Sequence, residues 1–306
     1  MLIIETHDLT KKYGNKTACD KINLAVEAGQ VYGFLGRNGA GKSTCIKMLT
    51  GLVYPTSGSG TVLGKPLGDV SARAKMGYLP ELFRYQEWMT GLDLLNFHAQ
   101  IIKIKNPKEQ INRILKLVGL EGQEKYKVGS YSKGMQQRIG LASALLSNPE
   151  LIFLDEPTSA LDPIGRKDVR DIIVNLKNQG MTVFLNSHLL SEVEAVSDSV
   201  TIIHKGTVVK SAQMDELLMN RILLTIRAKG ITEELMARLK NQYDSLQKHA
   251  DGRITILLNN YEQIPVLASS LTADGVTLYE LSPHRETLET VFLQIVGEEG
   301  LLSKQS

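Results

Sequence analysis

The sequence is poor in cysteine, in aromatic residues and in net charge. It contains two cysteines and one tryptophan among 306 residues, and aromatic residues make up 6% of the chain. Cys19 and Cys45 are too few for a disulfide framework and lack metal-ligand spacing, which favours a reducing, cytoplasmic compartment. The 35 Lys and Arg nearly balance the 33 Asp and Glu. This balance excludes a strongly basic nucleic-acid binder, so we expect no nucleic-acid partner.

Long hydrophobic runs are missing as well. No segment approaches the roughly 18 consecutive apolar residues of a membrane-spanning helix. Glu5, His7 and Asp8 interrupt the N-terminal stretch where a secretory signal would need an apolar run. We therefore expect any membrane association to be peripheral, on the inner face of the cell membrane and through a partner that spans it.

Residues 1 to 215 alternate between strand and helix patterns. An apolar run at 31–35 leads into a glycine-rich loop and then into a helix pattern. Two amphipathic helices are expected between 91 and 120, and buried strands at 151–154 and 182–185 flank a further helix. Such alternation predicts an α/β fold with a mostly parallel sheet that is covered by helices.

The pattern of apolar and polar residues changes after residue 213. The pattern predicts strand 222–228, helix 232–242, a weak strand near 245–249, strand 253–258, helix 262–272, strand 276–281 and helix 285–296. This order resembles a split βαβ unit and predicts a small α+β C-terminal domain. We expect a first domain at 1–218, with a helical subdomain at about 82–148, and an accessory or regulatory second domain at 219–306.

A phosphate-binding motif lies between the apolar run and its helix. Residues 36–43, Gly-Arg-Asn-Gly-Ala-Gly-Lys-Ser, satisfy G-x-x-x-x-G-K-[ST] in the strand and helix context that this motif requires. Its glycines let backbone N–H groups turn onto phosphate oxygens, and the helix N-terminus adds its positive end. Lys42 reaches the β- and γ-phosphates, and the Ser43 hydroxyl suits Mg²⁺. The motif predicts a nucleotide site.

Two adjacent carboxylates follow the buried strand at 151–154. Asp155 at the strand end suits the Mg²⁺ shell, and Glu156 suits a general base that polarises the water attacking the γ-phosphate. Without the phosphate loop, a solvated acidic turn would be an equally good interpretation. Together the two motifs favour a site for a nucleoside triphosphate and Mg²⁺.

Over residues 1 to 215 these motifs resemble the ATP-binding cassette (ABC) ATPases. Residues 131–138, Tyr-Ser-Lys-Gly-Met-Gln-Gln-Arg, are similar to the ABC signature, which other P-loop enzymes lack. The resemblance implies a P-loop cassette with an antiparallel β subdomain and a helical subdomain. It also implies a head-to-tail dimer in which Ser132, Lys133 and Gly134 contact the γ-phosphate held by Lys42 of the opposite subunit.

The resemblance assigns the remaining site residues. It implies that Tyr13 stacks on adenine, that Asp162 belongs to the loop coupling the two sites, Ser159-Ala160-Leu161-Asp162, and that His188 contacts the γ-phosphate. The phosphate loop would bind nucleotide through Gly36, Asn38, Gly39, Ala40, Gly41, Lys42, Ser43 and Thr44. The residues expected to hold Mg²⁺ are Ser43, Glu81 and Asp155, and those expected to act in catalysis are Lys42, Glu81, Glu156 and His188.

Two positions depart from the family pattern. Glu81 stands where the family usually carries glutamine, and Lys133 replaces a glycine of the signature. A carboxylate at residue 81 can still ligate Mg²⁺, although it adds negative charge near the triphosphate. We hypothesise that the cation of Lys133 offsets this charge across the dimer.

Four aromatic residues, Phe83, Tyr85, Trp88 and Phe97, follow residue 81. In ABC transporters this region borders the groove that receives a helix of the membrane subunit, and aromatic anchors suit such docking. A second interpretation, that these rings fill the core of the helical subdomain, is as good from the sequence alone.

The C-terminal segment around Leu281-Ser282-Pro283 is similar to cassettes of bacterial exporters for drugs, sodium or antimicrobial peptides, whose permease is a separate chain. We therefore expect a transporter motor that works as a dimer, with two identical ATPase subunits favoured, beside a separate permease. The alternative is a soluble ABC ATPase acting on ribosomes or DNA, but such proteins typically have two cassettes or a long coiled coil. A P-loop switch or kinase would lack the signature.

Overall fold

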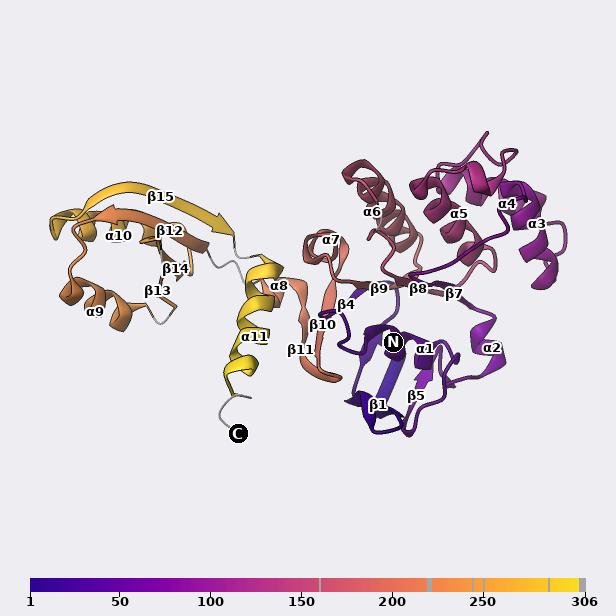
Figure 1. Ribbon diagram of the computed structural model, residues 1–306, viewed down its shortest axis with the longest axis horizontal. Helices are drawn as coiled ribbons and strands as arrows, with labels where there is room; N and C mark the ends of the chain where they lie inside the picture. Colours follow the sequence, from indigo (N-terminus) through magenta and orange to yellow (C-terminus); the bar gives the residue numbers. More distant parts are fainter. Residues whose placement is uncertain (160, 219–221, 244, 250, 286, 303–306) are drawn as a thin grey trace. The chain divides into compact units, whose positions relative to one another are not determined.

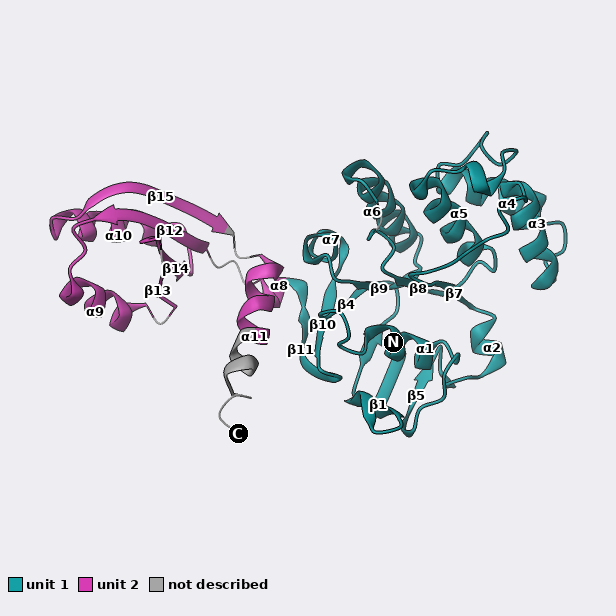
Figure 2. Ribbon diagram, in the orientation of Figure 1, with its two compact units in different colours: residues 1–214 teal, residues 215–306 magenta. Residues whose placement is uncertain are grey.

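The computed structural model describes residues 1–159, 161–218, 222–243, 245–249, 251–285 and 287–302. The chain divides into two compact units, Met1–Met214 and Asp215–Ser306 (Figures 1 and 2). Among the described helices, none is both long enough and apolar enough to cross a bilayer.

Unit 1 is built on a six-stranded sheet. Its strands, in spatial order, are β11 (Thr207–Gln213), β10 (Ser199–His204), β4 (Val31–Leu35), β9 (Thr182–Ser187), β8 (Leu151–Asp155) and β7 (Met76–Leu79). All neighbours pair in parallel except β10 and β11. Every residue of β4, β8 and β9 is buried, as expected for strands covered on both faces. The predicted α/β fold with a mostly parallel sheet is confirmed.

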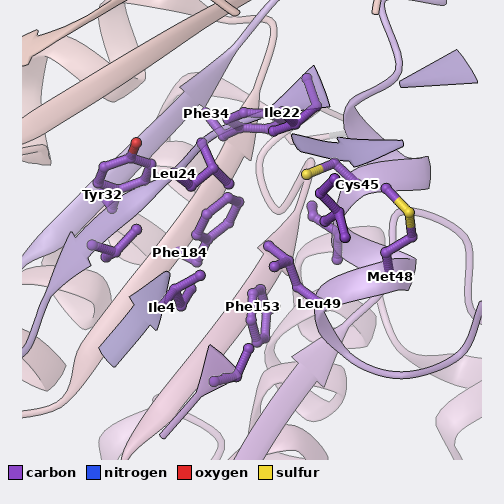
Figure 3. Packing of buried hydrophobic residues seen from close by; sticks show 14 of the residues in the cluster. Ile4, Ile22, Leu24, Tyr32, Phe34, Cys45, Met48, Leu49, Phe153 and Phe184 are labelled. Carbon is purple, nitrogen blue, oxygen red and sulfur yellow. The ribbon is translucent and has the colours of Figure 1, made fainter. Parts of the chain in front are cut away.

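A second, antiparallel sheet completes the β structure of unit 1. It contains β1 (Leu2–Tyr13), β2 (Lys16–Ile22), β3 (Ala25–Glu27), β5 (Ser57–Val62) and β6 (Lys65–Pro66). Its buried side chains join those of the parallel sheet and of helix α1 (Lys42–Leu49) in one hydrophobic cluster (Figure 3). The ring of Phe184 lies 5.3–5.4 Å, between centroids, from those of Tyr32, Phe34 and Phe153. This packing fixes α1 and the loop before it against both sheets.

Unit 1 contains six further α-helices and a 3₁₀ turn among its described residues before Met214. They are α2 (Val70–Arg73), α3 (Gly91–Ile101), α4 (Lys108–Leu117), the 3₁₀ turn η1 (Val128–Ser130), α5 (Lys133–Leu145), α6 (Pro163–Asn178) and α7 (Leu190–Val196). Of these, α3, α4, η1 and α5 fall within the segment 82–148 that the sequence analysis assigned to a helical subdomain. Helices α3, α4 and α5 contact one another, and α5 also contacts β7. Helix α3 begins at a capping box between Thr90 and Asp93, which satisfies N–H groups that have no partner within the helix.

Unit 2 is an α+β sandwich. Its elements are α8 (Met214–Leu217), whose first residue belongs to unit 1, β12 (Ile222–Lys229), α9 (Glu233–Gln242), β13 (Gln247–Lys248), β14 (Ile254–Leu258), α10 (Gln263–Ala273), β15 (Thr277–Arg285) and α11 (Leu288–Leu302). The antiparallel sheet has the order β13-β14-β12-β15. With a helix after the first and third strands, this order is that of the split βαβ fold. Buried Leu and Ile from β12, β14, α9 and α10 form a separate core.

Candidate nucleotide site

The phosphate loop connects β4 to α1, and the surrounding strands leave it little space. A Cβ atom at Gly36 would lie 2.5 Å from the carbonyl oxygen of Ile203, and one at Gly41 would lie 2.3 Å from that of Ala18. Gly41 also has a φ of 108°, which side chains rarely adopt. The N–H of Gly206 donates to the carbonyl of Ala40 at 2.9 Å. Glycine at 36 and 41 therefore lets the loop pass close to its neighbours.

Lys42, the first residue of α1, is buried at the bottom of this loop. Its Nζ donates to the carbonyl oxygens of Gly36 at 2.7 Å and Arg37 at 3.4 Å, and lies 3.9 Å from Glu156 Oε1. Burial lowers the pKa of Lys42, and the nearby carboxylates, Glu156 first and then Asp155, oppose this effect. These carboxylates favour the ammonium form, which is the form that attracts phosphate.

Asp155 ends β8 and is buried beside Ser43. The Ser43 hydroxyl donates to Asp155 Oδ1 at 3.4 Å, and the side-chain amide of Asn186 donates to the same oxygen. Mg²⁺ prefers such hard oxygen ligands and usually takes one or two carboxylates, completing its shell with substrate phosphates and water. The hydroxyl of Ser43 and the carboxylate of Asp155 fit this ion.

Glu156 turns its carboxylate back toward the loop. Its Oε2 lies 2.7 Å from Nδ1 of His188 and accepts the His188 backbone N–H at 3.3 Å. Its own N–H donates to the carbonyl of Asn186 at 2.9 Å. Its φ of 55° lies in the left-handed region, at a cost of order 1 kcal/mol for a residue with a side chain. The carboxylate of Glu156 thus contacts both Lys42 and His188.

A pocket of about 540 Å³ opens over these residues. The predicted site residues that line it are Asn38, Gly39, Gly41, Lys42, Ser43, Thr44, Glu81 and Glu156. Its other lining residues, which the sequence analysis did not identify, are Lys16, Thr17, Ala18, Asn186, Lys205 and Gly206. They come from the start of β2, the end of β9 and the turn between β10 and β11, and no local motif marks them. The two additional lysines favour an anionic ligand.

Glu81 follows β7 and reaches the same pocket. Burial raises the pKa of Tyr78 to about 12, and the negative charges of Asp155 and Glu81 contribute to this rise. Glu81 also acts on Lys42, whose ammonium form it favours. The carboxylate of Glu81 therefore belongs to the electrostatic environment of the phosphate loop.

Tyr13 lies at the edge of the site, at the end of β1. It pairs across the β1–β2 hairpin with Lys16, which lines the pocket. Its ring is half exposed, and Lys11 Nζ lies 5.1 Å from the ring centroid. An exposed aromatic ring beside the pocket suits stacking on a base, which remains a prediction.

The signature residues lie at the N-terminus of α5 and do not line this pocket. The Ser132 hydroxyl caps the helix by accepting the N–H of Met135 at 3.2 Å, and Lys133 begins the helix. A Cβ atom at Gly134 would meet nothing closer than 3.9 Å, so its surroundings are open. Asp162 caps α6 by accepting the N–H of Gly165 at 2.9 Å, and Ala160 lies outside the described residues. The contacts predicted for these residues across a dimer remain predictions.

Comparison with known proteins gives consistent matches. The family model described as ABC transporter matches residues 19–159. The bacitracin transport ATP-binding protein BcrA of Bacillus licheniformis is 37% identical over 301 residues, which cover 96% of this chain and 97% of that protein. An uncharacterized ABC transporter ATP-binding protein of Synechocystis is 35% identical, and the match covers 99% of this chain and 87% of that protein. The solved structure of an ATP-binding subunit of an ABC transporter is 28% identical with a TM-score of 0.64, covering 70% of this chain and 91% of that chain.

The phosphate loop yields a direct test. In Gly41→Ala the new methyl group must displace the loop from Ala18, so we expect ATP affinity to fall at least tenfold, a loss of about 1.4 kcal/mol. Gly180→Ala is the matched control, because Gly180 has a similar φ of 87° but open space around it. Titration with a fluorescent ATP analogue measures both. Equal affinities in the two variants would contradict the close approach at Gly41.

Proposed function

Because the chain belongs to the family of ABC transporter ATP-binding proteins, we propose that it is the motor subunit of an exporter, hydrolysing ATP to drive a separate membrane permease. The supporting observation is the pocket in which Lys42, Ser43 and Glu156 meet, with Glu156 held by His188 at 2.7 Å. A binding module needs the phosphate loop alone, whereas a buried carboxylate beside that loop supplies a base.

In the proposed hydrolysis the phosphate loop and Lys42 bind the triphosphate, and Glu156 accepts a proton from the attacking water. His188 orients the carboxylate of Glu156 through its ring nitrogen and its backbone N–H. Ser43 and Asp155, with Glu81, would hold Mg²⁺, which when bound neutralises part of the charge on the phosphates. The contribution of this chain is to hold these groups in place around the transferred phosphate.

The signature residues act on a second subunit in this proposal. The N-terminus of α5 presents backbone N–H groups and the ammonium of Lys133, which together form an anion-binding end. Ser132, Gly134 and the ammonium of Lys133 would contact the γ-phosphate bound by the Lys42 of an identical partner, and Asp162 would lie at the same junction. ATP then joins two subunits, and its hydrolysis separates them.

The permease would bind the helical subdomain. A groove of about 530 Å³ between this subdomain and β7 has a mixed lining, with aromatic and apolar side chains such as Tyr85, His98 and Ile102 beside the polar Arg73, Ser143 and Ser147. Trp88 is 73% exposed and Phe97 40% exposed, whereas a Cβ atom at Gly140 would touch the ring of Phe83. The half-buried Phe83 thus packs against α5, while Trp88 is available to a partner helix. Through this partner the chain would be peripheral to the membrane.

The two parts of the chain would have different functions. We assign nucleotide chemistry to residues 1–218 and an accessory or regulatory role to residues 219–306. The functional residues discussed above all come from the first of these segments, and unit 2 has its own core.

Replacement of the base separates binding from chemistry. In Glu156→Gln we expect ATP hydrolysis to fall by about 10²- to 10⁴-fold while ATP still binds, so that an ATP-dependent dimer accumulates. Phosphate release and size-exclusion chromatography with ATP and Mg²⁺ measure the two effects. Glu150→Gln, which changes an exposed glutamate paired with Lys75, should behave as the unchanged chain. A Glu156→Gln chain that stays monomeric with bound ATP would refute the dimer scheme.

The role of Glu81 is tested through Mg²⁺. Removal of this negative charge in Glu81→Gln should strengthen ATP binding without Mg²⁺, and loss of a carboxylate ligand should raise the half-saturating Mg²⁺ concentration several-fold. Nucleotide titrations in EDTA and at varied Mg²⁺ separate these effects. Glu87→Gln is the control, since Glu87 is exposed nearby and is not among the residues lining the pocket. An unchanged Mg²⁺ titration would show that Glu81 does not ligate Mg²⁺.

The docking surface is tested at its exposed ring. Trp88→Ala should weaken recruitment to membranes roughly tenfold, as expected for an aromatic anchor, while ATP binding and the melting temperature stay near those of the unchanged chain. Cell fractionation and thermal unfolding measure these quantities. Tyr54→Ala, at a ring of similar exposure elsewhere in unit 1, is the control. Loss of folding in Trp88→Ala would instead indicate that the ring belongs to the core.

A further inference from the structure

Asn186, near the end of β9, has one satisfied and one unsatisfied side-chain group. It is completely buried and lines the nucleotide pocket. Its amide Nδ2 donates to Asp155 Oδ1, but its Oδ1 finds no hydrogen-bond partner among the described residues. A buried acceptor without a partner destabilises the structure, so a donor that reaches it on ligand binding recovers the lost hydrogen-bond free energy.

The orientation of this amide follows from its neighbour. Asp155 and Asn186 are direct partners in the parallel pairing of β8 with β9. An ionised carboxylate only accepts hydrogen bonds, so rotation of the amide by 180° would bring two acceptors together. The contact with Asp155 therefore keeps Nδ2 on the carboxylate and leaves Oδ1 as the free group.

The same residue also holds the second carboxylate. The backbone carbonyl of Asn186 accepts the N–H of Glu156 at 2.9 Å, in the turn where Glu156 has its left-handed conformation. One residue of β9 thus contacts both Asp155 and Glu156, through its side chain and its backbone respectively. A displacement of Asn186 would therefore disturb the positions of both Asp155 and Glu156.

The chemistry of the ligand identifies the missing donor. Triphosphate oxygens are acceptors, so they cannot satisfy the Oδ1 of Asn186. The ammonium of Lys42 has three N–H groups, and its Nζ donates to the carbonyl oxygens of Gly36 and Arg37 and lies 3.9 Å from Glu156 Oε1, so its partners lie elsewhere. Mg²⁺ usually keeps several water molecules when it binds nucleotide, and these waters are strong donors. Asp155, which suits Mg²⁺, is in direct contact with Asn186.

We propose that Asn186 is a positioning residue for the Mg²⁺–nucleotide complex: its Nδ2 fixes the carboxylate of Asp155, and its Oδ1 accepts a hydrogen bond from the ion's hydration shell. This inference rests on the proposed function. Groups that orient metal ligands in this way are typically worth 10- to 100-fold in metal affinity or activity.

The test measures Mg²⁺ dependence of binding. Asn186→Leu keeps the size of the side chain but removes donor and acceptor, so the Mg²⁺ concentration that half-saturates binding of a fluorescent ATP analogue should rise at least about tenfold. Affinity for the same analogue in EDTA is measured in each variant and reports whether the phosphate loop is intact, so that the Mg²⁺ effect is taken relative to it. Asn186→Ser, with a shorter polar group, should give an intermediate rise.

Thr182→Val on the same strand is the matched control. Thr182 is buried, its hydroxyl accepts the N–H of Gly29 at 2.9 Å, and it is not among the residues lining the pocket. Its loss should lower stability without moving the Mg²⁺ titration. An unchanged Mg²⁺ titration in Asn186→Leu overturns the inference. If Asn186→Leu does not bind the analogue in EDTA, the Asn186→Ser variant decides, and an unchanged Mg²⁺ titration in that variant overturns the inference. If the unmodified chain binds no ATP, the proposed function itself fails.

Discussion

The site depends on the parallel register of three central strands. β4 pairs with β9 up to Leu35 and Ser187, and β9 pairs with β8 up to Asn186 and Asp155. Parallel strands end at the same edge of a sheet, so the phosphate loop after β4 and the carboxylates after β8 come together. A slip of one residue in the β8–β9 pairing would turn Asp155 to the other face of the sheet, and a slip in the β4–β9 pairing would displace the start of the phosphate loop. The buried rings around Phe184 oppose such a slip because they interlock side chains of β4, β8 and β9.

Much of this site was predictable because it lies in continuous segments. The spacing of residues 36–43 and the apolar strand before Asp155 carry their own local signals, and so do the signature residues. These motifs predicted the ABC family, which the comparisons confirm. Lys16, Asn186 and Lys205 were missed because each stands alone in the sequence and reaches the pocket only through sheet pairing and the packing of turns. A single residue of this kind gives no periodicity or spacing from which to argue.

In the fold, too, local patterns were predictable from the sequence and long-range pairing was not. The alternation of elements predicted the parallel sheet of unit 1, and the order of strands and helices predicted the α+β architecture of unit 2. The strand order β13-β14-β12-β15 agrees with the split βαβ unit that this pattern resembles, but the register of its pairs, such as Ile222 with Leu258, was not contained in the pattern, since it depends on contacts over long distances along the chain. The two-residue β13 had a weak signal for a physical reason: both of its residues are exposed, so no apolar alternation marks it.

The left-handed backbone of Glu156 has an evolutionary consequence. Glycine adopts that conformation without strain, so a change of residue 156 to glycine relaxes the main chain while it deletes the carboxylate. A substitution of Glu156 by glycine would therefore relieve the strain of this turn and remove the carboxylate from the site at the same time. Under the proposed function, the carboxylate is what selection would retain at this torsion.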